Sequence, residues 1–180
     1  PKPKLWIKQY VSANSQYNVN STGSCTINAL EAAIQLPFNP VISVNIIDNI
    51  VNIAGQYKSD KHTNTEDIFS KFTRYHTRLK PFDKYQGSVR DINAILTKMI
   101  SIINTTNKDV SIVITKPPES VFIYGYINGS IILYDSHPRP DNNLNGSHML
   151  LFKDNESILS YLQELFQYMP DMDDYMGGQY

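Results

Sequence analysis

Cysteine is almost absent from this sequence. The 180 residues contain a single cysteine, Cys25, so no disulfide can form within the chain. This excludes a fold stabilised by disulfides and is typical of a reducing, cytoplasmic setting. The four histidines have no further cysteines to act with, which argues against a structural zinc site. We therefore expect neither a metal nor a cofactor.

An excess of positive charge and a long hydrophobic run are also missing. The chain has 16 Lys and Arg against 17 Asp and Glu, a formal net charge of −1. Without a bulk positive field to attract a polyanion, nucleic acid is not an expected partner. We find no apolar run long enough to span a bilayer and no signal-peptide pattern, so we expect no association with a membrane.

The remaining composition is typical of a folded protein. Hydrophobic residues make up 41% and charged residues 18% of the chain, and a chain of this length can bury a core in one domain. We predict a single, monomeric domain at 1–180. Within it we expect an irregular N-terminal segment at 1–23 and a frayed tail at 171–180.

The first half of the chain carries helical periodicity. Apolar residues recur at helical spacing in four segments: 24–36, 43–57, 65–79 and 88–104. In the first segment, Ser24 is a candidate N-cap and Pro37 ends the pattern. Cys25 then falls at the first helical position, where backbone N–H groups lack helical partners.

The second half changes to strand patterns. "DVSIVITK" at 109–116 is a β-branched run, and two further runs are joined by Asn128-Gly129, a strong hairpin signal. "SHMLLF" at 147–152 is typical of a last strand, and 154–169 returns to helical spacing. Because helices precede strands instead of alternating with them, we predict an α+β fold with N-terminal helices packed on a C-terminal antiparallel sheet.

Cys25 is the candidate nucleophile. A thiolate is the reactive form of cysteine, and the partial positive charge at a helix N-terminus stabilises it. The alternative is a buried cysteine that packs as a small hydrophobe. A nucleophilic cysteine needs a base, normally an imidazole, and a group that orients that base.

"YDSHPRP" at 134–140 supplies both of those groups. In a strand, residues i and i+2 project to one face, so Asp135 and His137 would lie side by side at the strand's end. The carboxylate would fix the imidazole tautomer and stabilise the imidazolium. His148 is the alternative base, but it has no carboxylate two residues away. We interpret His62 and His76 as solvated residues.

An acyl-transfer reaction also needs hydrogen-bond donors for an oxyanion. The backbone N–H of Cys25 would be one donor. A side-chain amide from the polar segment upstream could be the second, and that segment offers Asn14, Gln16, Asn18 and Asn20. We choose Gln16, with Asn14 as the alternative.

Two motifs and the interval between them resemble a known family. "GSCTINAL" at 23–30 is similar to a Gly-x-Cys-x-x-Asn-Ala-Leu helix start, and "LYDSH" at 133–137 is similar to a hydrophobic-Asp-x-His strand ending. Both are found in the cysteine peptidase domain of herpesvirus large tegument proteins and in its cellular and bacterial relatives, the viral-tegument-like deubiquitinases. The two motifs bracket most of the domain.

The resemblance implies a papain-like cysteine peptidase fold that cleaves peptide and isopeptide bonds after the C-terminal glycine of ubiquitin, with ubiquitin or polyubiquitin as partner. It implies Cys25 as nucleophile, His137 as base and then acid, Asp135 as orienting carboxylate and Gln16 as oxyanion donor. The sequence departs from the viral pattern in two ways. Gln16 lies closer to the cysteine, and His148 occupies a position where the viral domains need no histidine.

Passage of ubiquitin's two terminal glycines implies a narrow channel, for which we name Tyr17, Tyr134 and the loop 139–146 as candidate walls. The stripe of Phe69, Phe72 and Tyr75 is expected to belong to the core, and Asn28 to have a structural role. Three alternatives stay open. They are a different papain-like cysteine peptidase or acyltransferase, a ubiquitin-like-protein peptidase, and an inactive ubiquitin-binding module.

Overall fold

A computed structural model of the protein describes residues 4–19, 24–39, 41–57, 64–167 and 178–179. The helices are α1 (Gln16–Val19), α2 (Cys25–Gln35), α3 (Val44–Ala54), α4 (Thr65–Lys71), α5 (Thr73–Arg78), α6 (Ile92–Thr106) and α7 (Asn155–Leu165), with 3-10 turns at Val89–Asp91 and Pro140–Asn142. The strands are β1 (Lys8–Val11), β2 (Gln86–Gly87), β3 (Val110–Lys116), β4 (Glu119–Gly125), β5 (Ile131–Asp135), β6 (His148–Phe152) and β7 (Gly178–Gln179). The predicted α+β class is confirmed.

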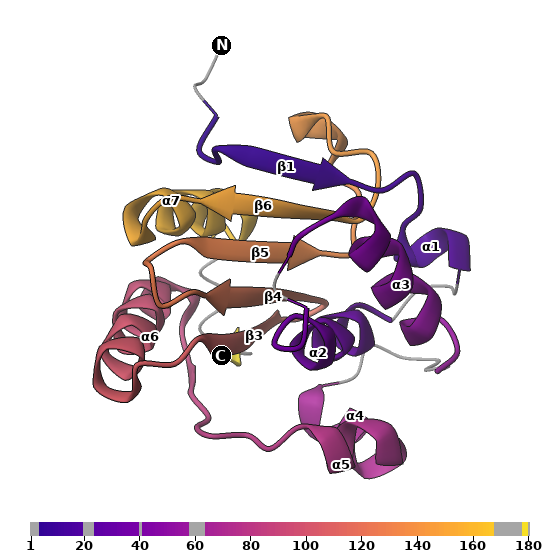
Figure 1. The fold of residues 1–180 in the computed structure, drawn as a ribbon, viewed down its shortest axis with the longest axis horizontal. Helices are drawn as coiled ribbons and strands as arrows, with labels where there is room; N and C mark the ends of the chain where they lie inside the picture. The colour runs from indigo at the N-terminus through magenta and orange to yellow at the C-terminus, as the bar shows by residue number, and fades with distance from the viewer. Residues whose placement is uncertain (1–3, 20–23, 40, 58–63, 168–177, 180) are drawn as a thin grey trace.

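The strands form one antiparallel sheet in the order β1-β6-β5-β4-β3-β7-β2. Its centre is the meander β3-β4-β5-β6, as Figure 1 shows. The predicted hairpin joins β4 to β5, where Gly129 has φ +92° and its N–H donates to the Tyr126 carbonyl at 3.0 Å. A positive φ is where glycine is favoured, so the hairpin prediction is confirmed.

Helices cover both faces of this sheet. Alternate residues of β5 point to opposite faces, so Ile131 and Leu133 pack with α6 and α7. Ile132 and Tyr134 pack with α2 and α3 on the other face, where Figure 1 shows those two helices crossing in front of the strands. The expected arrangement of N-terminal helices on a C-terminal sheet is therefore only half of the architecture, because α6 and α7 form a second layer.

Polar contacts dock α2 on the sheet. Thr26, in its first turn, shares a hydrogen bond of 2.9 Å with the buried Ser120 of β4. Ser120 in turn lies 2.8 Å from the Thr115 hydroxyl of β3. Buried hydroxyls are costly unless they are paired. These pairs fix the N-terminus of α2, and so Cys25, against the β3–β4 turn.

A buried carboxylate anchors α5 to the same helix. Glu31 of α2 is fully buried and accepts hydrogen bonds from Arg74 Nε and Nη2 at 3.1 and 2.7 Å. The Tyr75 hydroxyl also donates to it at 3.0 Å. Tyr75 is fully buried, and the third predicted helix is interrupted before it. Phe72, with φ −120° and ψ 112°, separates α4 from α5.

The N-terminal segment differs from the irregular segment expected at 1–23. Its residues Lys8–Val11 form β1, which pairs with β6 from Lys8 opposite Leu151 to Val11 opposite His148. Gln16–Val19 form α1. The expected frayed tail lies outside the described residues except for Gly178–Gln179, which form β7. Strand β1 fixes the chain that leads into α1, and α1 lies at the right-hand end of the sheet in Figure 1.

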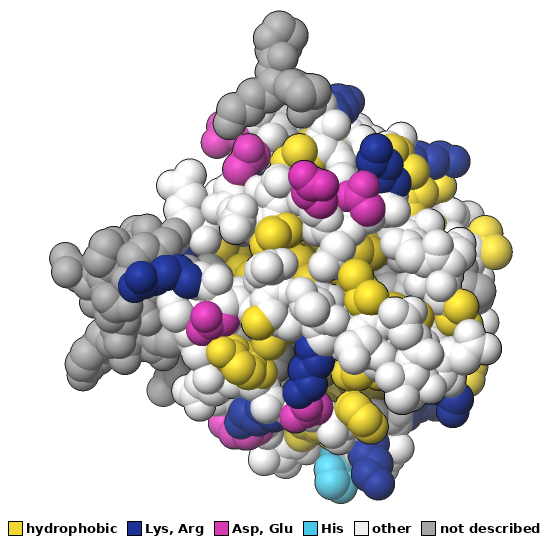
Figure 2. Space-filling model, turned by 90° about the vertical axis from the view of Figure 1, so that its left-hand side faces the viewer, with side chains coloured by type: hydrophobic (Ala, Val, Ile, Leu, Met, Phe, Trp, Pro, Cys, Tyr) yellow, Lys and Arg dark blue, Asp and Glu magenta, His cyan; other side chains and the backbone are white. Residues whose placement is uncertain are grey.

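The surface carries mixed charge on the side shown in Figure 2, where cationic and anionic groups are interspersed around a central group of hydrophobic side chains. This view looks at the end of the molecule opposite to α1. None of the described helices has both the length and the apolar character needed to cross a bilayer.

Candidate active site

Three distant parts of the chain meet at one end of the sheet. Cys25 is the first residue of α2, His137 follows the end of β5, and Tyr17 of α1 lies near both. The Cys25 side chain is close enough to His137 to help raise the pKa of that ring. The Cys25 sulfur lies 3.6 Å from the Pro118 carbonyl oxygen in the turn between β3 and β4. The predicted nucleophile and the predicted base therefore lie close together.

Asp135 holds the ring of His137. Its Oδ1 accepts from His137 Nδ1 at 2.7 Å and from the backbone N–H of His137 at 3.0 Å. Since β5 ends at Asp135, this contact is a tight local turn in which an Asp side chain bonds to the backbone two residues on. It does not come from strand alternation, which was the reason for predicting it. With Nδ1 engaged, Nε2 is the ring nitrogen left for Cys25.

The electrostatics of this pair favour charge separation. Burial would lower the pKa of His137, but hydrogen bonds with Asp135 and Cys25 outweigh it and raise the pKa to about 10. Burial would likewise raise the pKa of the Asp135 carboxyl, yet the contact with His137 and the charge of Arg139 hold that pKa well below its usual range. At neutral pH the site thus contains a carboxylate and an imidazolium, and an adjacent imidazolium stabilises a thiolate.

Arg139 is a residue that the sequence placed only in a candidate channel wall. Its Nε donates to Asp135 Oδ2 at 2.8 Å. Its Nη1 and Nη2 donate to the two oxygens of Glu119 at 3.2 and 2.8 Å. The side chain is 18% exposed, so this is a partly buried network. No spacing rule pairs Arg139 with Glu119, because the contact crosses from the 136–147 loop to the start of β4.

Gln16 lies beside the pair and is buried. Its Oε1 accepts from the Ser136 hydroxyl at 2.6 Å. The Tyr17 ring lies 6.2 Å from the His137 ring. With Oε1 engaged, the amide nitrogen of Gln16 carries the N–H groups that a ligand could accept from. Gln16 therefore lies next to the candidate site, as the sequence predicted.

The other candidate amides are placed differently. Asn14 is exposed, and the contacts described for it are made by its backbone, with Ser12 Oγ and Ser147 N. Asn18 Oδ1 accepts from the backbone N–H and the hydroxyl of Ser15 at 2.8 and 3.1 Å. Asn20 lies outside the described residues. Of the four amides, Gln16 is the one with a described contact to the 135–137 segment.

His148, the alternative base, is fully buried in β6 opposite Asp135. Its Nδ1 donates to the Gly146 carbonyl at 2.9 Å, and among the described residues its Nε2 has no hydrogen-bond partner. Burial lowers the pKa of His148. It is thus a neutral core histidine without the carboxylate contact that His137 makes.

Two further predictions concern Asn28 and Tyr134. Asn28 Nδ2 donates to the Ser24 carbonyl at 2.9 Å, and its Oδ1 accepts from the Tyr134 hydroxyl at 3.0 Å. Asn28 therefore links the start of α2 to β5, which is the structural role expected for it. Tyr134 is 1% exposed, so its assignment as a channel wall is wrong. Its side chain points to the core between the sheet and α2.

Access to the sulfur is restricted. Cys25 is 3% exposed and His137 is 5% exposed. The neighbouring Tyr17 is 51% exposed, and its ring lies next to the His137 ring in a tilted orientation. A substrate carbonyl must therefore approach through a narrow path or displace side chains such as that of Tyr17.

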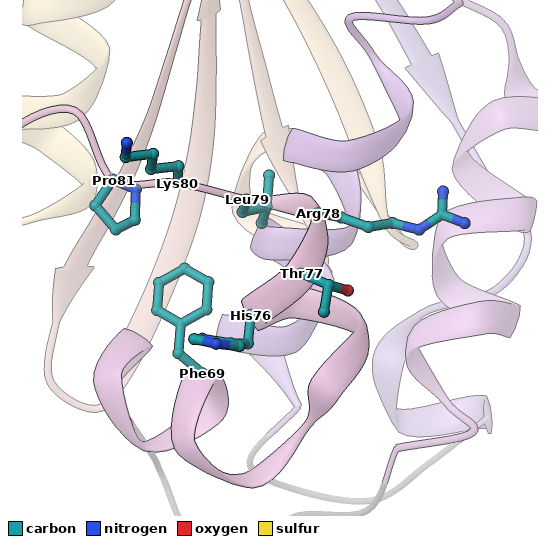
Figure 3. A pocket seen from close by; sticks show the side chains of 7 residues that line it. All are labelled: Phe69, His76, Thr77, Arg78, Leu79, Lys80 and Pro81. Atoms are coloured by element: carbon teal, nitrogen blue, oxygen red, sulfur yellow. The ribbon is translucent and has the colours of Figure 1, made fainter.

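A surface depression lies elsewhere, on α4, α5 and the segment that follows them. Figure 3 shows its lining residues: Phe69, His76, Thr77, Arg78, Leu79, Lys80 and Pro81. None of them belongs to the Cys25–His137–Asp135 group. His76 is exposed, as expected of a solvated histidine, while His62 lies outside the described residues. Of the predicted core stripe, Tyr75 is fully buried, and Phe69 and Phe72 are half-buried.

The chain matches no family model and no curated protein in sequence comparisons. Within the part of the chain that the structure describes, no group of three or more His, Cys, Asp or Glu side chains is arranged to hold a metal ion. The side chains of the site are therefore what indicates its chemistry. The two motifs, "GSCTINAL" and "LYDSH", are what indicates a resemblance to a family.

Proposed function

We propose that this protein is a cysteine-type deubiquitinase with a papain-like catalytic domain. The single observation that carries the catalytic part is the grouping of the three side chains: His137 Nδ1 bonds to Asp135 at 2.7 Å, and Cys25 is close enough to the same ring to raise its pKa. The ubiquitin part is supported by the similarity of "GSCTINAL" and "LYDSH" to viral-tegument-like deubiquitinases. The restricted approach to Cys25 is in keeping with a substrate that ends in two glycines, because glycine leaves room for a backbone to pass.

In the proposed reaction, the thiol proton of Cys25 already resides on His137 Nε2, so Cys25 starts as a thiolate beside the imidazolium. The sulfur then bonds to the carbonyl carbon of ubiquitin's last glycine, whose oxygen becomes an oxyanion. When the oxyanion collapses, the bond to the departing amine breaks and His137 gives its proton to that amine, leaving a thioester on Cys25. A water molecule, deprotonated by His137, attacks the thioester and releases the ubiquitin carboxylate and the thiolate.

Two donors are proposed for the oxyanion, the backbone N–H of Cys25 and the side-chain amide of Gln16. Such donors act because they are fixed in place before charge develops. The hydrogen bond between Gln16 and Ser136, at 2.6 Å, fixes the amide relative to the segment that carries His137. A chain with one cysteine and no disulfide is typical of a reducing compartment, so we also propose a cytoplasmic location.

One observation favours a second candidate function. Because Cys25 is 3% exposed, the domain could bind ubiquitin without cutting it. Such a module predicts ubiquitin affinity in the wild type and in Cys25→Ala alike, with no hydrolysis by either. The polar groups needed for the reaction are nevertheless in contact with one another, which is why hydrolysis is the main proposal.

The test is a panel of electrophilic probes that carry ubiquitin or other ubiquitin-like modifiers, combined with hydrolysis of a fluorogenic ubiquitin C-terminal amide. We expect the ubiquitin probe to label the wild type and the amide to be hydrolysed, and Cys25→Ala to lose both. Labelling by another modifier alone would indicate a ubiquitin-like-protein peptidase. Binding without labelling or hydrolysis would indicate the inactive module.

A further inference from the structure

We infer that Arg139 is a positioning residue of the proposed active site, which holds the Asp135 carboxylate in the orientation that aims its Oδ1 at His137. The inference rests on the proposed function, because it assigns a role within the same site. Arg139 contacts neither Cys25 nor His137 in any described hydrogen bond, so it would act through Asp135.

The bonds of Asp135 are divided between its two oxygens. Oδ1 accepts from the ring and the backbone of His137 at 2.7 and 3.0 Å, and Oδ2 accepts from Arg139 Nε at 2.8 Å. Rotation about the bond that carries a carboxylate is soft, so a carboxylate held at one oxygen can turn. Arg139 holds the second oxygen of a fully buried side chain and thereby removes this freedom.

Arg139 is itself fixed at its other end. Its two terminal nitrogens donate to the carboxylate of Glu119, the first residue of β4, at 3.2 and 2.8 Å. The planar guanidinium can make several such bonds in one rigid geometry, which lysine cannot do. Glu119 directly follows Pro118, whose carbonyl oxygen lies 3.6 Å from the Cys25 sulfur. Arg139 therefore connects the acid–base pair to the turn beside the nucleophile.

The charges around Asp135 give the inference a measurable consequence. Its carboxylate faces the cations His137 and Arg139, with His148 of β6 and Tyr161 of α7 also within electrostatic range. Removing the guanidinium takes away one of the two cations that keep the carboxylate ionised in acid. The acid limbs of the pH profiles of kcat and of Cys25 alkylation should then move to higher pH. A substitution that only destabilised the fold would not move them.

The test compares Arg139→Gln and Arg139→Lys with the matched control Arg74→Gln. Arg74 also bonds to a buried carboxylate, that of Glu31, which no described hydrogen bond links to Asp135 or His137. Two readouts are followed against pH. The first is kcat and KM for the fluorogenic ubiquitin C-terminal amide, and the second is the rate of Cys25 alkylation by iodoacetamide, which needs no ubiquitin.

We expect Arg139→Gln to lower kcat by about 10 to 100-fold with KM nearly unchanged, the effect of a misplaced catalytic group. The acid limbs of kcat and of alkylation should both move up by about one pH unit. Arg139→Lys should restore the acid limb, because it keeps the charge. Its kcat should stay reduced by about fivefold, because lysine lacks the planar fork that holds Glu119 at two points while it bonds to Asp135. Arg74→Gln should lower the melting temperature and leave both profiles in place.

An Arg139→Gln variant with wild-type kcat and wild-type acid limbs would overturn the inference, and so would an Arg74→Gln variant that shows the same shift. If the wild type does not hydrolyse ubiquitin derivatives, the alkylation profile decides alone. A shifted limb then supports the inference while the proposed function fails, and an unshifted limb overturns it. If Arg139→Gln does not fold, a wild-type kcat in Arg139→Lys would overturn it.

Discussion

Two buried histidines, His137 and His148, lie near Asp135. They differ in their hydrogen bonds and in the direction of their pKa shifts. His137 bonds to the carboxylate and lies close to Cys25, and its pKa is raised to about 10. His148 lies opposite Asp135 on β6, but it bonds to the Gly146 carbonyl and its pKa is lowered. Burial acts on both rings in the same direction. The direct hydrogen bonds therefore decide which histidine is charged, and closeness to a carboxylate without a bond is not enough.

The comparison assigns the role of general base to His137. Separate substitutions of His137 and His148 test that assignment. We expect His137→Ala to lower kcat by about 10³ to 10⁴-fold while ubiquitin binding persists, because proton transfer to and from Cys25 is lost. His148→Gln, which retains an amide donor for the Gly146 carbonyl, should remain active. Steady-state hydrolysis of the fluorogenic ubiquitin amide measures both. An inactive His148→Gln beside an active His137→Ala would reverse the assignment.

The next largest effect is expected at Gln16. Loss of one oxyanion donor typically lowers kcat by about 10² to 10³-fold, and we expect Gln16→Ala to fall in that range. Gln16 also accepts a hydrogen bond from Ser136, so Ser136→Ala is the matched control that removes this bond and keeps the amide. If kcat falls equally in Ser136→Ala and Gln16→Ala, Gln16 supports the loop and is not the donor. A larger loss in Asn14→Ala than in Gln16→Ala would move the role to Asn14.

Substitution of Asp135 sharpens the comparison between the two rings. In Asp135→Asn the amide oxygen can still accept from His137 Nδ1, but the negative charge that favours the imidazolium is gone. We expect kcat to fall by about 10²-fold, less than in His137→Ala. NMR titration of the ring should show a lower pKa of His137. A kcat loss as large as that of His137→Ala would mean that Asp135 does more than orient and stabilise the ring.

The smallest expected effects are those on the free energy of unfolding. His137 and His148 should change this free energy with pH in opposite directions. The folded protein raises the pKa of His137, so this residue stabilises the fold below pH ~6.5 and loses that contribution as the pH rises toward about 10. The folded protein lowers the pKa of His148, so His148 contributes stability above pH ~6.5 that is lost as the pH falls further. Each slope is at most about 1.4 kcal/mol per pH unit.

Urea unfolding at a series of pH values measures these slopes. We expect His137→Gln to flatten the alkaline side of the stability curve, and His148→Gln to flatten the acid side. If His148→Gln leaves the acid side unchanged, the buried ring is not held neutral by its surroundings, and the contrast between the two histidines disappears.

Much of the fold could be predicted from local patterns. The hairpin at Asn128-Gly129, the strand at 147–152 and the helix beginning at Cys25 follow from residue type and spacing. Strand β1 could not be predicted, because its alternation is weak and its pairing partner β6 lies more than a hundred residues along the chain. The break at Phe72 also escaped prediction, because the helical spacing of apolar residues continues across it.

Some features of the candidate site could likewise be predicted from local sequence, and others could not. The Asp135–His137 contact was predictable because two residues close in sequence make it, although a tight local turn brings them together. The pairing of Cys25 with His137 was predicted from the need of a nucleophilic cysteine for a base, and the family resemblance agreed with it, but spacing alone could not bring the two residues together. The roles of Arg139 and Glu119 were not predictable, because a salt bridge between a loop and a distant strand leaves no periodic signal.

The central claim is that Cys25 and His137 form a reacting pair, and alkylation of the chain's one cysteine tests it most directly. Iodoacetamide labelling at pH 6, followed by mass spectrometry, compares the wild type with His137→Ala. An unassisted thiol is mostly protonated at that pH, so we predict rapid labelling of the wild type and labelling at least about tenfold slower in the variant. Equal rates in the two proteins, or a folded wild type that resists labelling altogether, would contradict the account.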